Sequence, residues 1–482
     1  MNFSIVKRTL GWILLFLAIF FLLPLITAIV YWEEEFFSFL MSIGICGALG
    51  CLCLIGNPKK NSLYAKEGFV IVALSWIVIS AFGALPFFLS GATPSYVDAL
   101  FEMVSGFTTT GSSILTGAQI DNMAKSLLLW RSFSHWVGGM GVLVLIMAFL
   151  PLSGAKNMHM MKAESPGPSV GKLVPKVRQT AIILYAIYAG MTVLQFIMLL
   201  CGGMPVFDAL NTSFATAGTG GFAIKSSGMA GYNLYLQIVV TVFMLLFSIN
   251  FNSYYLIGKG KLRDAFNAEV RVFLIIVVSA ISLITLDLCL SHYGGYTVGE
   301  AIQHASFYVA SIISTTGLGT VDYNLWPAFS KTILVLLMFI GACAGSTGGG
   351  MKVSRHIILA KNGMREIGSL IHPKRIKKVT IDKRPVDHEV VRSVTAYLVA
   401  YILIFVLSLL LISLEGNDLA TNFSSVATTI NNVGPGLAKV GPTGNFADFS
   451  VFSKFVFIFD MLIGRLEIFP MLVLFAPATW RK

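Results

Sequence analysis

The chain has 482 residues, of which 56% are hydrophobic and only 12% are charged. Soluble domains carry about a quarter charged residues, so this composition excludes a soluble enzyme core, an intrinsically disordered chain and a small disulfide-stapled secreted domain. Apolar runs long enough to cross a hydrocarbon core about 30 Å thick recur along almost the whole sequence. The composition therefore predicts an all-α, polytopic membrane protein.

Ten apolar runs predict ten membrane spans, and an even number puts both termini on one side of the membrane. The runs lie near residues 11–31, 37–56, 69–90, 125–150, 180–201, 232–257, 270–291, 328–345, 393–414 and 451–475. The first run continues through Tyr31 to three glutamates, which favours a signal-anchor span over a cleaved signal peptide.

The net charge of +11 is explained mainly by topology. Of the 34 Lys and Arg, 27 fall at the termini or in the loops of one side, at residues 56–68, 151–179, 258–271 and 352–392. By the positive-inside rule that side is cytoplasmic, so we expect both termini in the cytoplasm. Basic loops that face anionic inner-leaflet lipid need no nucleic-acid partner to explain them.

Four loops on the opposite side repeat one pattern, in which an acidic residue is followed by mixed residues, a hydroxyl-rich run and a glycine. The acidic residues are Asp98, Asp208, Glu300 and Asp418, and the glycines are Gly111, Gly220, Gly317 and Gly434, spaced 109, 97 and 117 residues apart. Each copy lies between two apolar runs, which predicts four units of span, loop and span. Each loop is long enough for a helix of about ten residues but too short to cross, so it must enter the bilayer and return.

The repeated loops carry the chemistry of a cation pathway. Non-helical backbone at membrane depth must line a cavity or be buried in protein. Glycine allows a strand to turn its carbonyls inward, and such oxygens can replace the hydration shell of a cation. The preceding helices would point their partly negative ends at the centre, and their acidic residues could concentrate cations at the mouth. One Thr-Gly pair would indicate an ordinary turn, but four at matching places favour a pore.

A glycine-rich stretch from Gly341 to Lys352 follows the eighth run, where each glycine disfavours helix by about 1 kcal/mol. A phosphate-binding loop is excluded because Met351 precedes Lys352 and an apolar run comes before the motif. We expect a flexible gating loop at mid-depth, and the alternative is a tight helix crossing that needs small residues. The predicted gate residues are Gly345, Ser346, Thr347, Gly348, Gly349, Gly350 and Arg465.

Arg465 lies inside the last run, where a permanent charge is costly and tends to face a water-filled path or a partner. We expect it to project into the pore below the filter and to oppose cation passage. The alternative is a structural ion pair between spans, and Asp460 and Glu467 are the nearby acidic residues.

At this point the sequence resembles the Trk/Ktr/HKT superfamily of potassium transporters, over roughly Gly68 to Pro477. The motifs that carry the resemblance are Ser105-Gly-Phe-Thr-Thr-Thr-Gly-Ser, Trp136-Val-Gly-Gly-Met-Gly, Gly345-Ser-Thr-Gly-Gly-Gly-Met-Lys, Ile430-Asn-Asn-Val-Gly-Pro-Gly-Leu and Gly464-Arg-Leu-Glu-Ile-Phe-Pro. The resemblance implies four units of membrane helix, pore loop and membrane helix around one pore, in a bacterial inner membrane. The first two spans resemble the additional hairpin of the bacterial Trk type.

The implied division of the chain is an N-terminal hairpin at 1–60, pore repeats at 68–150, 178–258, 269–360 and 390–477, a gating loop at 341–352 and a basic cytoplasmic loop at 361–389. The resemblance assigns a K⁺ filter to Thr109, Thr110, Gly111, Ser112, Gly218, Thr219, Gly220, Gly221, Thr315, Thr316, Gly317, Leu318, Asn432, Val433, Gly434 and Pro435. In this family, glycine at all four central positions goes with potassium, so K⁺ is the expected cargo and Rb⁺ its surrogate. In the second unit the central glycine is uncertain by one position, because Gly218, Gly220 and Gly221 lie close together.

The resemblance also implies partners. The segment 361–392 carries nine Lys and Arg and by composition alone is a solvated loop. In the family such loops dock a cytosolic nucleotide-binding regulatory ring of the TrkA type, and the proteins form homodimers. This chain has no nucleotide-binding fingerprint of its own, so nucleotide sensing is expected from the partner.

Two other classes of function compete with a K⁺ pathway. A secondary carrier for a small solute, coupled to Na⁺ or H⁺, would have inverted repeats, whereas these four units begin and end on the same sides. A membrane-embedded enzyme would need clustered His and acidic residues, but the seven histidines are dispersed, and His135 is interpreted as an interfacial or packing histidine. The six cysteines are interpreted as buried small hydrophobes. We therefore expect no enzyme activity and no cofactor; coupling of K⁺ flux to H⁺ or Na⁺ symport stays open.

Overall fold

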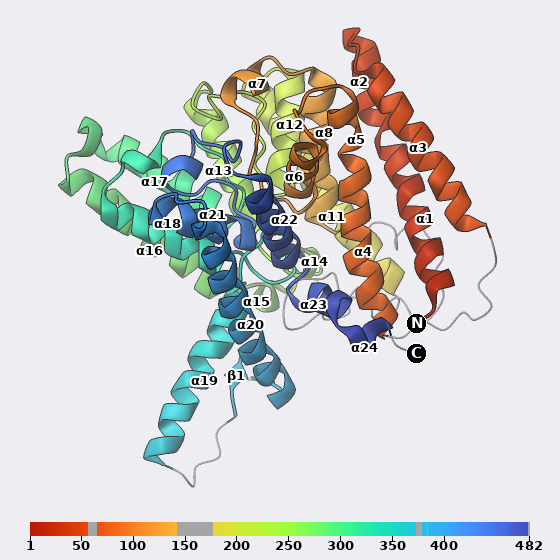
Figure 1. The fold of residues 1–482 in the computed structure, drawn as a ribbon. Coiled ribbons are helices and arrows are strands. Elements are labelled where there is room, and N and C mark those ends of the chain that lie inside the picture. The colour runs from red at the N-terminus through yellow and green to blue at the C-terminus, as the bar shows by residue number, and fades with distance from the viewer. Residues whose placement is uncertain (56–64, 142–176, 373–377, 383, 481–482) are drawn as a thin grey trace.

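The apolar runs form helices in a computed structural model of the protein (Figure 1). The structure describes residues 1–55, 65–141, 177–372, 378–382 and 384–480. The end of the span predicted near 125–150, most of the loops at 56–68 and 151–179, part of the basic loop at 361–389, and Arg481 and Lys482 lie outside the described residues. Within the described residues the only sheet is a two-stranded hairpin, as expected for an all-α protein.

The chain begins with two antiparallel arms, α1 (Phe3–Phe20) continued by α2 (Leu22–Tyr31), and α3 (Phe36–Leu54). Glycines bring the arms close together. A Cβ at Gly11 would lie 2.8 Å from the Cβ of Cys53, and a Cβ at Gly50 would lie 2.9 Å from Leu15. Small residues at a crossing are typical of helix pairs in membranes, where close van der Waals packing drives association.

Four units follow, and each has a long helix, a short helix and a second helix. Their helices are α4 (Ala65–Gly83) with α5 (Leu85–Leu89), α6 (Tyr96–Phe107) and α8 (Lys125–Gly139); α11 (Val177–Cys201), α12 (Val206–Ala217) and α13 (Leu234–Phe247) with α14 (Phe251–Gly258); α16 (Ala268–Leu290), α17 (Val298–Ile313) and α18 (Ala328–Ile340); and α20 (His388–Ser413), α21 (Leu419–Asn431) and α22 (Val451–Arg465).

Shorter elements connect or follow these helices. They are α7 (Gly117–Asp121), α15 (Leu262–Ala265), the 3-10 turns η1 (Tyr293–Gly295), η2 (Tyr323–Leu325) and η3 (Ala438–Val440), α19 (Val353–Ile371), α23 (Phe469–Phe475) and α24 (Pro477–Trp480). The strands β1 (Thr380–Ile381) and β2 (Arg384–Pro385) pair antiparallel, with Thr380 opposite Pro385.

The short helices α6, α12, α17 and α21 have 12, 12, 16 and 13 residues, fewer than the roughly 20 that a membrane span needs. Side chains fix where three of them begin. Ser95 caps α6, Thr297 forms a capping box with Glu300 on α17, and Asp418 caps α21. Their C-terminal halves are almost completely buried, so these helices end inside the protein.

The long helices expose apolar side chains on their outer faces. α16 exposes Ile275, Val278 and Leu286, and α20 exposes Leu403 and Leu410. Such faces suit contact with lipid, and among the described residues six helices are long and apolar enough to cross a membrane. The expectation of six buried cysteines is wrong, because only Cys46 and Cys343 are buried. A small apolar cysteine can face lipid as readily as the core.

The second helices are shorter than the predicted runs because they break. α13 and α14 form a pair bent by 92°. α18 ends at Gly341, and α22 ends before Glu467 and Ile468, which have left-handed φ angles of 58° and 67°. Broken helices are tolerated at membrane depth only where other groups satisfy the freed backbone.

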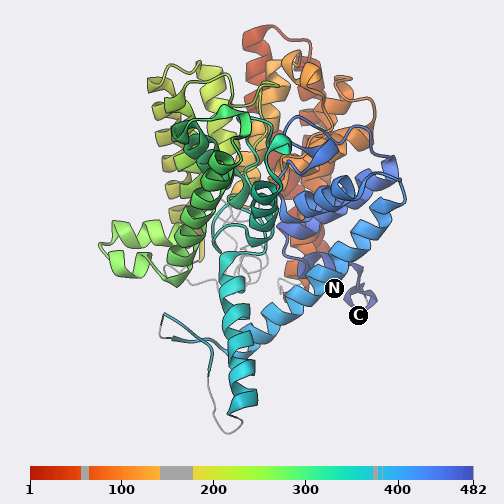
Figure 2. The ribbon, with the colours of Figure 1, turned by 90° about the vertical axis from the view of Figure 1, so that its left-hand side faces the viewer.

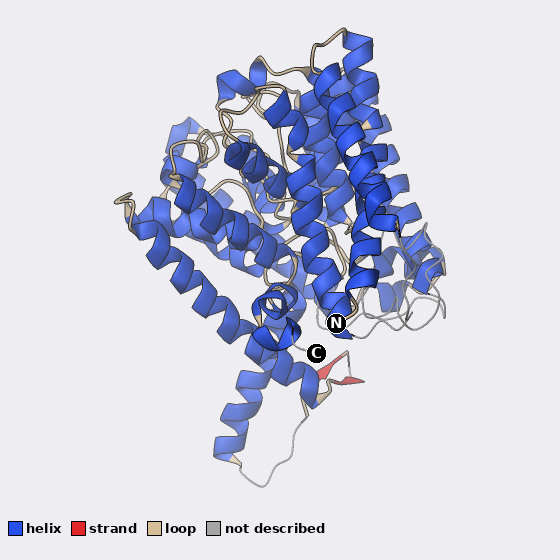
Figure 3. Ribbon diagram, turned by 45° about the vertical axis from the view of Figure 1, so that its right-hand side comes forward, coloured by secondary structure: helices blue, strands red, loops and turns tan. Residues whose placement is uncertain are grey.

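Both termini lie at the same end of the molecule, and α19 extends beyond the helical body toward that end (Figures 1 and 2). Figure 3 shows the small hairpin of β1 and β2 on the same side, beside α19 and α20. α19 leaves its apolar residues Met364, Ile367 and Leu370 exposed.

Candidate functional site

The four short helices end in the same backbone turn. Just after each short helix, a single residue adopts a left-handed conformation. These residues are Thr109 (φ 56°), Thr219 (φ 55°), Thr315 (φ 59°) and Asn432 (φ 54°). The N–H of the next residue then bonds the carbonyl five residues back, at 2.8–2.9 Å in all four copies. Threonine rarely adopts this conformation, so its recurrence in three copies means that the surrounding structure imposes the turn.

We call the segments that begin at these residues the loop strands: 109–112, 219–222, 315–318 and 432–435. A glycine with positive φ lies two residues after each left-handed residue, namely Gly111 (81°), Gly221 (74°), Gly317 (80°) and Gly434 (96°). The central glycine of the second strand is therefore Gly221, one position later than the Gly220 expected from the sequence. Gly220 instead corresponds to Thr110, Thr316 and Val433, and Gly218 is the C-cap of α12.

The central glycines link the four loop strands into a closed ring. A Cβ at Gly111 would collide with the carbonyl oxygen of Gly220, and a Cβ at Gly221 with that of Thr316. A Cβ at Gly317 would collide with the oxygen of Val433, and one at Gly434 would lie 2.8 Å from that of Thr110. Each strand thus presses its glycine against the carbonyl of the next, and the fourth returns to the first.

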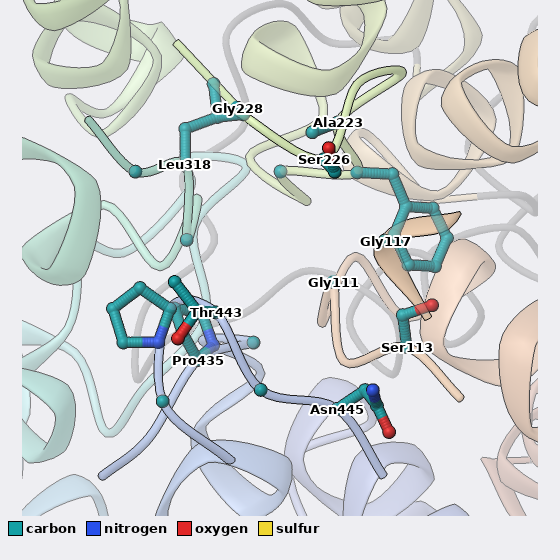
Figure 4. Close-up of a pocket in the computed structure, with 18 of the residues that line it drawn as sticks. Gly111, Ser113, Gly117, Ala223, Ser226, Gly228, Leu318, Pro435, Thr443 and Asn445 are labelled. Carbon is teal, nitrogen blue, oxygen red and sulfur yellow. The ribbon is translucent and has the colours of Figure 1, made fainter. Parts of the chain in front are cut away.

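A cavity of about 360 Å³ opens beside this ring, and all four central glycines line it. Figure 4 shows lining residues from the four units, including Gly111, Ser113, Leu318 and Pro435, around an open centre. The predicted meeting of four distant chain segments is therefore present in the structure. Within the described residues no group of three His, Cys, Asp or Glu side chains comes together, so the oxygens available here are mainly backbone and hydroxyl oxygens.

Side chains add ties between the first and fourth strands. The Oγ of Ser112 donates to the carbonyl of Gly434 at 3.2 Å. Asn432 donates from Nδ2 to the Oγ1 of Thr110 at 2.9 Å and to the carbonyl of Met461 at 2.9 Å. Asn432 thus anchors the fourth strand to both α22 and the first strand.

A buried ion pair behind the first strand could not be recognised from the repeat pattern. Glu102 on α6 and Arg131 on α8 are almost fully buried and lie 2.8 Å apart. Glu102 also accepts from the Ser113 hydroxyl and from the N–H of Ile114, and Arg131 donates to the carbonyl of Ala223 at 3.2 Å. The pair is fully hydrogen-bonded, which offsets its desolvation. The signal that the sequence offered for this pair was Arg131, a charged residue within the apolar α8.

The predicted acidic residues lie at the starts of the short helices, and two of them are neutralised. Asp98 pairs with Lys454 of the fourth unit at 2.7 Å, and Asp208 pairs with Lys225 at 2.6 Å. The hydrogen bond from Lys225 to Asp208 raises the pKa of that lysine. These two carboxylates therefore join elements and contribute less to the field at the mouth than the sequence pattern suggested.

The glycine-rich loop, residues 341–352, satisfies the backbone freed by the break between α13 and α14. The N–H of Cys343 donates to the carbonyl of Ser248 at 3.0 Å, and the N–H of Phe251 donates to that of Gly345 at 3.0 Å. The Oγ1 of Thr347 donates to the carbonyl of Phe247 at 3.1 Å. The loop and the helix break pair with each other, as membrane depth requires.

The same loop contacts the third loop strand and the end of α21. The N–H of Gly349 donates to the Oγ1 of Thr315 at 2.6 Å, and the N–H of Gly350 donates to the carbonyl of Asn431 at 3.0 Å. Glu269 on α16 spans the base of the loop, because its Oε1 accepts from the N–H groups of Ala344 at 2.7 Å and Ser354 at 3.1 Å.

Arg465 connects the glycine-rich loop to the first unit. Its guanidinium donates to the carbonyl of Thr347 at 2.8 Å and to the carbonyls of Gly138 and Gly139 at 2.6 Å each. The nearby acids have other partners: Glu467 pairs with Arg355, and Asp460 accepts from Ser408 at 2.7 Å. The arginine therefore bridges backbone carbonyls of two elements at the depth where the second helices break.

Comparison with known proteins agrees with this architecture. Residues 36–482 match the family model TrkH, described as "Cation transport protein". The Trk system potassium uptake protein TrkH of Halomonas elongata is 34% identical, with 100% of both chains covered, and TrkG of Escherichia coli K12 is 32% identical, with 99% of both chains covered.

A solved structure, that of the potassium transporter TrkH from Vibrio parahaemolyticus, superposes with a TM-score of 0.89 at 33% identity and covers 100% of both chains. That likeness extends over the N-terminal arms as well as the four units. The chain is thus a polytopic helical membrane protein and not an enzyme, and it belongs to the TrkH family of cation transport proteins.

Proposed function

We propose that this protein forms the pore for potassium uptake across a bacterial inner membrane, with the four loop strands as its selectivity filter. The observation that carries the proposal is the closed ring in which each central glycine abuts a carbonyl of the next strand. The four carbonyls of this ring, those of Thr110, Gly220, Thr316 and Val433, can replace the water around a cation. The names of the full-length relatives, which are potassium uptake proteins, support K⁺ as the cargo.

The helices behind the strands favour a cation at this point. α6, α12, α17 and α21 each end next to a loop strand, and the C-terminal end of a helix carries a partial negative charge. The pore needs no acidic ligand of its own, because the helix ends and the carbonyls of the buried loop strands supply the field. This arrangement suits a monovalent cation that must also leave again.

The glycine-rich loop acts as the gate in this proposal. It contacts the third loop strand through Gly349 and the last residue of α21 through Gly350, and it is held from the side by Arg465 through Thr347. Of the five glycines in the stretch 341–350, Gly341, Gly345 and Gly350 have positive φ, so the loop is not helical. A loop with this backbone can rearrange without unwinding a helix.

The cytosolic side is assigned to the end that carries both termini and α19. The positive-inside distribution of Lys and Arg supports this orientation. A cytosolic nucleotide-binding ring is the proposed regulator, docking near α19 and the basic segment after it, and a homodimer is the proposed assembly. Both rest on the family resemblance. A ring that moves α19 would act on the gate, because α19 begins where the glycine-rich loop ends.

A secondary carrier for a small solute remains the alternative. It would alternate access around a site shaped for that solute, whereas four strands of equivalent backbone around one centre favour a small spherical ion.

Uptake of ⁸⁶Rb⁺ into proteoliposomes, with excess K⁺ or Na⁺ as competitor, tests the proposal. We expect uptake above that of protein-free vesicles and stronger competition by K⁺ than by Na⁺. Equal competition by both ions would remove the selectivity claim but keep the pore. Uptake no greater than in protein-free vesicles would refute the function.

A further inference from the structure

His135 lies at the junction of the first two units. It is fully buried on α8, one helical turn after Arg131. Its Nδ1 lies 2.7 Å from the carbonyl oxygen of Gly106 on α6, and its Nε2 accepts from the N–H of Phe222 at 3.2 Å. The two ring nitrogens therefore contact two segments that are 116 residues apart in sequence.

The hydrogen bonds define the protonation state of the ring. A backbone N–H can only donate, so Nε2 must carry a free lone pair toward Phe222. A backbone carbonyl can only accept, so Nδ1 must carry the proton toward Gly106. Only the neutral tautomer with the proton on Nδ1 makes both bonds. The imidazolium has no acceptor nitrogen, and the other neutral tautomer has its donor at Nε2 and its acceptor at Nδ1.

The imidazole also fills the space directly behind the second loop strand. A Cβ at Gly220 would collide with the ring atoms of His135, and a Cβ at Gly218 would collide with its backbone carbonyl. The centroid of the imidazole lies 4.3 Å from the ring centroid of Phe222. Arg131, on the neighbouring turn of α8, places its guanidinium carbon 4.1 Å from the same Phe222 centroid. The second strand cannot move toward α8 without meeting this side chain.

We propose that His135, as the neutral Nδ1–H tautomer, is a positioning residue that sets the place of the second loop strand and so the ion selectivity of the pore. The inference rests on the proposed function, since it concerns the same ring of carbonyls. Gly220 supplies one of the four ring oxygens, and Gly220 is the residue whose backbone packs on the imidazole. His135 acts through the strand and does not itself touch the ion.

Three substitutions separate the roles of the ring. His135→Gln can keep an acceptor near the Nε2 position for the N–H of Phe222. His135→Asn can keep a donor near the Nδ1 position for the carbonyl of Gly106 but is too short to reach Phe222. His135→Phe keeps the volume and loses both bonds. His388→Gln, at an exposed histidine at the start of α20, is the matched control.

The readout is the ratio of K⁺ to Na⁺ concentrations that halve ⁸⁶Rb⁺ uptake. We expect the parent preference in His388→Gln and most of it in His135→Gln, which keeps the bond to the second loop strand at Phe222. In His135→Asn and His135→Phe we expect a loss of about tenfold, the change that loss of the buried hydrogen bond to Phe222 implies. If the parent protein prefers K⁺ and the His135→Phe variant shows the same preference, the inference is overturned and the proposed function is left intact. A parent without uptake would overturn the proposed function instead.

The tautomer is tested in the unmodified protein, so the inference stays open to refutation if a variant fails to fold. Protein with ¹⁵N-labelled histidine is compared with its His135→Gln variant, and the missing signals are those of His135. We expect a protonated Nδ1 and an unprotonated Nε2 at neutral pH. A protonated Nε2 would overturn the inference.

Discussion

Replacing Arg465 by alanine removes the link between the glycine-rich loop and the first unit. The side chain makes three charge-assisted hydrogen bonds, one to Thr347 of the loop and two to the end of α8 at Gly138 and Gly139. If the loop moves away when the pore opens, only the bond to Thr347 is broken, because the other two join parts of the helical body. That bond therefore measures how strongly Arg465 favours the closed state.

A hydrogen bond to a charged group contributes about 1.5–3 kcal/mol. Its loss should change the ratio of closed to open protein by about 10- to 150-fold, since about 1.4 kcal/mol corresponds to a factor of ten. The same substitution also removes a positive charge beside the glycine-rich loop, and this loss should act in the same direction on a cation. We expect the rate of ⁸⁶Rb⁺ uptake to rise about tenfold or more, up to the limit set by a fully open pore.

Arg465→Lys separates the two effects, because it keeps the charge but cannot bridge three carbonyls from one planar group. An increase in Arg465→Lys close to that in Arg465→Ala would assign the effect to the bridge, and a parent-like Arg465→Lys would assign it to charge. Lys331→Ala is the control, since Lys331 also donates to a backbone carbonyl, that of Asn324 at 3.0 Å, but outside the glycine-rich loop. An Arg465→Ala rate equal to that of the parent would refute the role of Arg465 in the gate.

Three further predictions concern the strands, the loop and the outer surface. Gly111→Ser should lower the preference for K⁺ over Na⁺ in the uptake assay, because its Cβ would collide with the carbonyl of Gly220 and its φ is 81°. Gly91→Ser, at a φ of 72° but with open space around the Cβ, should leave the preference unchanged; equal effects of the two substitutions would contradict the packing argument. Glu269→Ala should raise uptake by freeing two N–H groups at the base of the loop, and Glu269→Gln, which keeps an acceptor, should raise it less; the reverse order would refute this reading of the contact. Hydrogen bonds from the Ser226 hydroxyl and N–H lower the pKa of Asp121 below its ordinary value of 3.8. The ionised Asp121 carboxylate therefore stabilises the fold fully above pH 3.8, and this stabilisation is lost as the pH falls through the lowered pKa. The melting temperature of Asp121→Asn should accordingly fall less on acidification below about pH 4 than that of the parent, and an identical fall in both would refute the contribution.

Much of the fold could be predicted because its signals are local. Apolar runs predict membrane helices, and an acidic or hydroxyl residue before a short run predicts where a buried helix begins, as Thr297 and Asp418 do. The four glycines at similar spacing also predicted that distant loops share one centre, and three of the four lie at the central position of their strands. These features depend on residues within a few positions of one another or on simple repetition.

The second strand illustrates where local signals end. Gly218, Gly220 and Gly221 are equally able to adopt positive φ, and the sequence does not choose among them. The choice is made by contact with α8, because His135 occupies the space beside Gly218 and Gly220 and leaves Gly221 to turn. The interpretation of His135 as a packing histidine was incomplete for the same reason, since its partner Phe222 is 87 residues away.

The sequence alone determined the class of protein, the number of repeated units and the chemistry of the glycine-containing loops, because hydrophobicity and glycine content are local properties of a segment. The tertiary structure alone decided which glycine is central in the second strand, which carbonyls Arg465 bridges and how the broken second helices satisfy their backbone. Arg465 and Gly138 are 327 residues apart, and no local preference encodes their meeting. Such contacts form only when all four units pack around one centre, where each freed carbonyl and N–H must find a partner in another unit.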